Sequence, residues 1–202
     1  MVFRIPLFVV LFIITLVAPA TALSLHGQTL VVGGGEIPLI ESPEGFKTEW
    51  YLHGSFLQPV DAKPLLFLYT GPQFTSGHTQ VKLLTGAFLT ADGGASATAS
   101  LWLNQQDFPT RHMHMFGEVD IYFPVRQHSR MQFYGLAEVF YHGHEHRGIG
   151  LEAEVFLDTD IWSVVAVGPV IQVSQYVSFF LAYDFNPHEA EPGVFVRLQL
   201  RL

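Results

Sequence analysis

The stretch GVFVRLQLRL, residues 193–202, decides the fold class, because apolar residues occupy every second position. Successive side chains of a strand point to opposite faces, so one face of this stretch is aliphatic: Val194, Val196, Leu198, Leu200 and Leu202. The other face carries Phe195, Arg197, Gln199 and Arg201. A strand with these two faces lies between an apolar and an aqueous environment.

The same alternation runs through most of the chain after residue 46. It is clear in SATASLWLN (96–104), HMHMFGEVDIYF (112–123), RMQFYGLAEVFYH (130–142) and GLEAEVFLD (150–158). Turn residues such as Asp92-Gly93-Gly94 separate these segments. The spacing predicts about ten strands, most of them longer than the usual ~5–6 residues of a globular strand and suited to the ~9–11 residues of a tilted membrane-spanning strand.

The scarcity of charge indicates which face points outward. Only 14% of the residues are charged, whereas a solvated surface is about 25–35% charged. An aliphatic outer surface and a polar interior suit that composition. We therefore expect an all-β fold: a single antiparallel up-and-down transmembrane β-barrel of about ten strands, with 8–12 compatible, over residues 46–202. The alternative is a soluble periplasmic lipocalin-like carrier, in which the aliphatic face points inward.

The first 22 residues have the layout of a secretory signal peptide. Arg4 precedes an apolar run from Ile5 to Val17, and Ala20-Thr21-Ala22 supplies a cleavage pattern. The run is shorter than the ~20 residues of a spanning helix, so we expect cleavage after Ala22. Residues 23–45 form a Gly-rich segment that either plugs the lumen or adds a strand at 28–33.

Two stretches are apolar on both faces, KPLLFLYTGPQF (63–74) and WSVVAVGPVIQV (162–173). Each contains a Gly-Pro pair, Gly71-Pro72 and Gly168-Pro169. Because proline cannot donate to a strand ladder, the pattern predicts a β-bulge at each pair.

The signal peptide, the amphipathic strands and an amphipathic last strand that ends at Leu202 make the chain similar to the small, porin-like outer-membrane β-barrel proteins of Gram-negative bacteria. The resemblance covers residues 46–202 and is a generic one. It implies location in the bacterial outer membrane, surrounding outer-membrane lipid, and recognition of the last strand by barrel-assembly machinery. Those proteins usually end in an aromatic residue, whereas this chain ends in leucine.

A histidine cluster flanks the stretch 140–148. If strands 112–123 and 130–142 form a hairpin centred near residue 127, His112 faces His142, and three further histidines lie nearby: His114, His144 and His146. Imidazoles at such a spacing bind Zn, Cu or Ni. The alternatives are polar filling of a narrow lumen, a hydrated turn, or a proton-sensitive rim. With ten strands, this turn and both ends of the mature chain would face the periplasm.

Charged residues on the polar faces predict a salt-bridge network inside the lumen, since a lone buried charge is costly. The acids are Glu118, Asp120, Glu138, Glu152 and Glu154. The bases are Arg197 and Arg201 on the last strand and Lys47 and Lys82 on the early strands.

The function that we expect is passive: a structural barrel or small pore with a narrow polar lumen and a His-rich periplasmic rim. A lipid-modifying Ser/His hydrolase or acyltransferase is the enzyme alternative, because His128-Ser129 and Ser76-Gly77-His78 place the two residue types together. No acidic partner is fixed by spacing, and no phosphate loop, nucleophile elbow or HExxH motif occurs, so an enzyme is not our prediction and no cofactor is assigned. A net charge of −8 without a basic run argues against nucleic-acid binding, and the lack of cysteine excludes thiolate chemistry.

Overall fold

The structure is a computed structural model that describes residues 24–43, 45–59, 63–91, 93–107, 110–124, 131–143, 147–158, 163–185 and 193–202. Eleven strands cover most of them: β1 (Ser24–Glu41), β2 (Phe46–Pro59), β3 (Leu65–Ser76), β4 (Thr79–Thr90), β5 (Ala95–Gln106), β6 (Met113–Pro124), β7 (Gln132–His142), β8 (Gly148–Asp158), β9 (Ser163–Ser174), β10 (Val177–Phe185) and β11 (Gly193–Arg201). The predicted signal peptide, residues 1–22, lies outside the described residues. Within the described ranges, no helix is long and apolar enough to cross a membrane.

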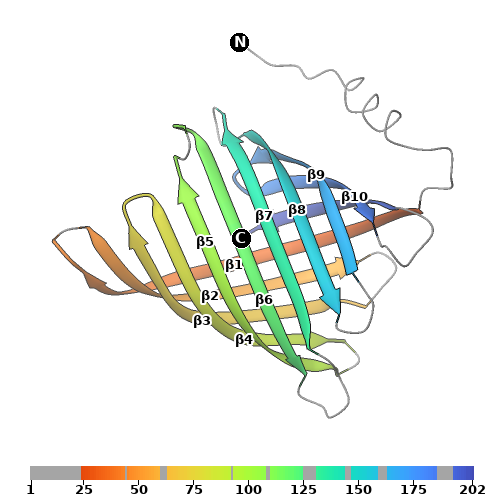
Figure 1. The fold of residues 1–202 in the computed structure, drawn as a ribbon, viewed down its shortest axis with the longest axis horizontal. Helices are drawn as coiled ribbons and strands as arrows, with labels where there is room; N and C mark the ends of the chain where they lie inside the picture. The colour runs from red at the N-terminus through yellow and green to blue at the C-terminus, as the bar shows by residue number, and fades with distance from the viewer. Residues whose placement is uncertain are drawn as a thin grey trace.

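The strands close into one barrel, in which each strand pairs with its neighbours in the chain and β1 pairs with β11 (Figure 1). This confirms the predicted all-β barrel of about ten strands. Ten strands, β2 to β11, run between residues 46 and 202, and β1 is the eleventh. β1 pairs with β2 in antiparallel fashion and with β11 in parallel fashion, because an odd number of alternating strands makes the first and last run in the same direction.

The parallel seam corrects the expected position of the chain ends. β1 begins beside the end of β2, where Gln28 pairs with Pro59, whereas Arg201 at the end of β11 donates a backbone hydrogen bond to Tyr176. The first and last strands therefore start and finish at opposite rims. We call the rim at which β11 ends the C-terminal rim, and the other the opposite rim.

Side chains alternate between the lumen and the outer surface as the sequence pattern requires. On β5, Ser100 and Trp102 are buried in the interior, whereas the intervening Leu101 is 48% exposed on the outside. On β8, Glu152 is only 3% exposed, whereas Leu151 is 57% exposed. The barrel thus buries polar residues and exposes aliphatic ones, the reverse of the usual arrangement in a water-soluble protein.

The two Gly-Pro pairs are not bulges, which corrects that expectation. The register between β3 and β4 is the same on both sides of Gly71, and the register between β9 and β10 is the same on both sides of Gly168. A Cβ atom at Gly71 would collide with the Leu83 carbonyl oxygen, and one at Gly168 with the Leu181 carbonyl oxygen. The missing side chains therefore let the backbone of the neighbouring strand approach closely at both positions.

The register shifts lie elsewhere. One lies between Pro38 and Ile40 of β1, and the other lies at the turn end of the β9–β10 hairpin, next to Ser178. Pro38 suits its place because β1 pairs with β11 only as far as Val32, so that residues 33–41 form an edge that requires no donor. This part of β1 projects with β2 beyond the rest of the wall (Figure 1).

Candidate functional site

The lumen contains a cavity of about 670 Å³. Its wall differs from side to side: β2 to β6 contribute mainly aromatic rings, whereas β7, β8 and β11 contribute most of the charges. Near the opposite rim the lining is apolar, with Leu57, Leu65, Phe67, Phe88 and Phe156. The volume and the mixed lining are typical of a site for a small molecule.

Eight of the nine charged residues that the alternation placed in the lumen line this cavity: Lys82, Glu118, Asp120, Glu138, Glu152, Glu154, Arg197 and Arg201. Arg197 is the centre of an ion-pair network. Its Nη1 donates to Glu154 Oε1 at 2.6 Å, and its Nη2 donates to Glu152 Oε1. The Tyr134 hydroxyl also donates to Glu154, at 2.8 Å, and all the charged heads are buried. The network ties β11 to β8 across two intervening strands.

Small inward residues make room for Arg197. Ala166, Val170, Phe180 and Ala182 of β9 and β10 form a buried apolar cluster together with Phe140 of β7. The guanidinium lies 4.9 Å from the centre of the Phe180 ring, a cation–π contact. The short side chains of Ala166 and Ala182 leave room for the arginine to lie along the inner wall and reach β8.

A second polar cluster surrounds Asp120, which is fully buried. The hydroxyls of Tyr69 and Tyr122 both donate to its Oδ2, at 2.7 and 2.9 Å. Glu118 lies two residues away on the same face of β6, so that both carboxyl side chains line the cavity. In the described part of the chain, neither carboxylate forms an ion pair.

The aromatic wall was not predicted as part of a site, whereas Lys82 was expected among the lumenal bases and does line the cavity. Lys82 of β4 is buried, and its Nζ lies 3.4 Å from the centre of the Tyr51 ring and 5.6 Å from that of Trp102. Trp102 forms edge contacts with Tyr69 and Phe116, at centroid distances of 5.5 and 5.9 Å. The sequence does contain a signal for this wall, namely aromatic residues on the polar faces of the strands. A ring that faces lipid would instead lie on the aliphatic face.

The β6–β7 hairpin has the register that the sequence predicted, and His114 pairs directly with Phe140. The rings of His114 and His142 stack at 5.7 Å, and His114 Nε2 forms a 2.7 Å hydrogen bond with Asn104. This pair lies at the C-terminal rim, beside Arg201 and Glu138 in a small recess.

His112 does not join the two lumenal histidines, which corrects that part of the predicted cluster. A φ of 76° at His112 turns its side chain to the outside, where the ring approaches Tyr141 at 6.4 Å. Its backbone N–H donates to Asp107 Oδ1 at 3.0 Å, and this hydrogen bond lowers the pKa of Asp107. The His112 carbonyl still accepts a hydrogen bond from the His142 N–H, so that the backbones are neighbours while the rings diverge.

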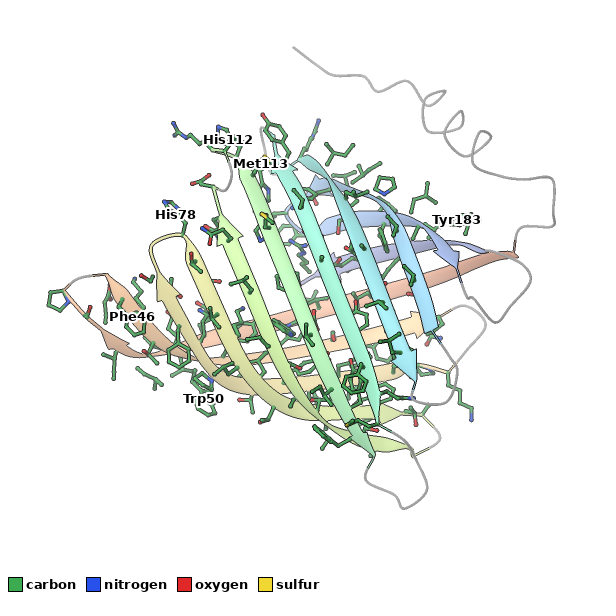
Figure 2. All side chains as sticks on the ribbon, viewed as in Figure 1. Phe46, Trp50, His78, His112, Met113 and Tyr183 are labelled. Atoms are coloured by element: carbon green, nitrogen blue, oxygen red, sulfur yellow. The ribbon has the colours of Figure 1, made fainter. Side chains whose placement is uncertain are left out.

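The metal site and the enzyme site stay predictions. His144 and His146 lie outside the described residues, and the described residues contain no group of three or more His, Cys, Asp or Glu that could hold a metal ion. His128 and Ser129 also lie outside the described residues. At the C-terminal rim, His78 Nδ1 lies 3.6 Å from Asp107 Oδ2, and both side chains are exposed (Figure 2 labels His78).

With the geometry of the lumen established, the chain was compared with known proteins. No family model, curated protein or solved structure matches it.

Proposed function

We propose that the protein is an outer-membrane β-barrel that works as a narrow passive pore. One observation carries the proposal: the polarity of the barrel is inverted. Outward-facing Leu83, Val119 and Leu151 are 50%, 52% and 57% exposed, whereas lumenal Asp120 and Glu152 are 0% and 3% exposed. Contact between an aliphatic outer surface and lipid is favourable, whereas exposure of the same surface to water raises the free energy of the barrel.

Aromatic residues support the same environment. Phe46, Trp50 and Tyr176 lie on the outside near the C-terminal rim, and Phe123 lies on the outside near the opposite rim. Figure 2 shows Phe46 and Trp50 pointing away from the barrel. Aromatic rings on the outside near both rims are typical of the interfacial girdles of membrane barrels.

A soluble lipocalin-like carrier would require the opposite placement of charge. In such a carrier, aliphatic side chains fill the interior of the barrel, whereas here the interior contains the buried salt bridges of Arg197 with Glu152 and Glu154. The exposed aliphatic residues would form a patch far beyond the few hundred Å² that monomeric soluble proteins tolerate.

The connections between strands support an orientation. At the C-terminal rim the connections between strands are 2 to 6 residues long, and the shortest are residues 77–78 and 175–176. At the opposite rim they are 4 to 7 residues long, and the longest are residues 125–131 and 186–192. Because membrane barrels have short periplasmic turns and longer outer loops, the C-terminal rim would face the periplasm.

The lumen supports a small pore rather than a wide channel. Eleven strands lie between the eight that side chains fill and the 16–18 of water-filled porins. Its lining carries five carboxyl groups and three bases, Lys82, Arg197 and Arg201, which favours cations over anions.

Two experiments test the proposal. Cell fractionation should recover the protein in the outer membrane, migrating differently on SDS gels before and after boiling. In planar lipid bilayers the purified barrel should then give small, cation-selective steps of conductance. Recovery in the soluble periplasm would refute the membrane location, and a barrel that inserts without conducting would refute the pore and leave a structural barrel.

A further inference from the structure

The carboxyl pair of Glu118 and Asp120 is the feature of the lumen that the ion-pair network does not explain. Arg197 is held by Glu152 and Glu154, and the Lys82 ammonium lies over the Tyr51 ring. Two neighbouring carboxyl groups on one face of a strand, of which Asp120 is fully buried, repel each other unless a proton or a cation lies with them.

Unpartnered polar atoms point to a ligand at the same place. Asp120 Oδ1 is buried and no hydrogen-bond donor of the described residues reaches it. Ser100 pairs in register with Asp120, and its buried Oγ is also without a partner in the described part of the chain. Buried polar atoms are normally satisfied, so these two atoms indicate an absent hydrogen-bonding group.

The surroundings restrict the chemistry of that group. Trp102 pairs in register with Glu118, and the rings of Tyr69 and Tyr122 bring their hydroxyls onto Asp120. Carboxylates exclude an anion, whereas carboxylates together with aromatic rings suit an ammonium group through charge-assisted hydrogen bonds and cation–π contacts. A calcium ion takes six to eight oxygen ligands, more than this pair supplies.

An apolar compartment continues from the carboxyl pair toward the opposite rim. Phe88 contacts Phe67 at a centroid distance of 5.0 Å and Tyr122 at 5.7 Å, so an aromatic cluster begins where the Asp120 cluster ends. Leu57 and Leu65 line the same part of the cavity. A molecule in this space meets apolar surface at the rim and negative charge in the interior.

We propose that the lumen binds a primary organic ammonium ion, with its amino group at Glu118 and Asp120 and its apolar substituent against Phe67 and Phe88. The inference rests on the proposed pore for the ligand's route into the lumen and names the class of solute that the pore would select. Binding itself requires only the closed barrel, so binding without conductance would refute the pore alone.

The test uses the full barrel in detergent and three probes of similar shape: 2-phenylethylammonium, neutral 2-phenylethanol and anionic phenylacetate. The chain has three tryptophans, so Trp50→Phe and Trp162→Phe leave Trp102 as the reporter of the site. The ammonium ion should change its fluorescence with saturation, and the other two probes should bind at least about tenfold more weakly, a difference of roughly 1.4 kcal/mol.

Two variants locate the site. Glu118→Gln should weaken ammonium binding about tenfold or more, because it removes a charge from the pair. Glu41→Gln makes the same chemical change at an exposed position of β1 and should leave binding unchanged. Equal binding of the three probes would overturn the proposal without any variant. Unchanged affinity for the ammonium ion in a folded Glu118→Gln barrel would also overturn it. A barrel that binds calcium through Glu118 but does not bind the amine would overturn it as well.

Discussion

Replacement of Arg197 by methionine should strongly destabilise the barrel. The substitution keeps an apolar stem over Phe180 but leaves the buried carboxylates of Glu152 and Glu154 without a cation. Removal of one partner of a buried ion pair typically costs about 3–5 kcal/mol, because the other charge stays buried without compensation.

The measurement is urea unfolding of the barrel in lipid vesicles, followed by the unboiled gel shift and by tryptophan fluorescence. Arg197→Met should lower the free energy of unfolding by about 3–5 kcal/mol. The triple variant Arg197→Met, Glu152→Gln, Glu154→Gln should recover most of this loss, because it removes the buried charges as well. Arg201→Met, which removes an arginine at the exposed end of β11, should cost about 1 kcal/mol or less.

An Arg197→Met barrel whose free energy of unfolding lay within about 1 kcal/mol of that of the unmodified barrel, the range of a solvated surface pair, would contradict this expectation. A triple variant as unstable as the single one would show that lost packing against the inner wall, rather than uncompensated charge, causes the effect.

Three further predictions follow from other parts of the barrel. Gly168→Ala should prevent most of the chains from closing into a barrel, because the new Cβ would collide with the Leu181 carbonyl oxygen. The readout is loss of the fast-migrating band on unboiled SDS gels. Gly35→Ala is the control and should close normally, because its new Cβ meets open space. Asp107→Asn should slightly lower the free energy of unfolding at neutral pH. Because the pKa of Asp107 is lowered in the folded state, the carboxylate's contribution to stability is lost as the pH falls through that lowered value. A difference in stability between variant and parent that persists in strong acid would contradict this. Epitope tags placed directly before β1 and directly after β11 should be accessible to antibody from opposite faces of the membrane, because the seam is parallel, and labelling of both tags from one face would contradict an eleven-strand barrel.

The alternation of side chains was enough to predict the barrel wall from residue 46 onward. It also predicted the β6–β7 register and the eight lumenal charges, because a period of two assigns each residue to one face. The full length of β1 was not predictable by the same rule. Gly33-Gly34-Gly35 and Pro38 interrupt its pattern, and β1 forms because β2 and β11 supply partners on both sides of its first half.

Other features depend on geometry that a linear pattern does not contain. Gly71 and Gly168 are required because the backbone of a neighbouring strand lies close to each of them, and that contact is between strands. His112 leaves the lumen because its backbone has a positive φ, although its place in the alternation is regular. The aromatic wall was missed because rings on a polar face are consistent with several environments until the strands are closed around them.

The orientation of side chains relative to lipid is the central claim, and site-directed spin labelling tests it most directly. The chain contains no cysteine, so single cysteines at Leu101 and Leu151 on the outside and at Glu118 in the lumen can each carry one nitroxide. In lipid vesicles, the labels at 101 and 151 should relax with oxygen, which concentrates in lipid, and the label at 118 with a water-soluble nickel complex. Labels at 101 and 151 that respond to the nickel complex instead would place the aliphatic face in water and contradict the membrane barrel.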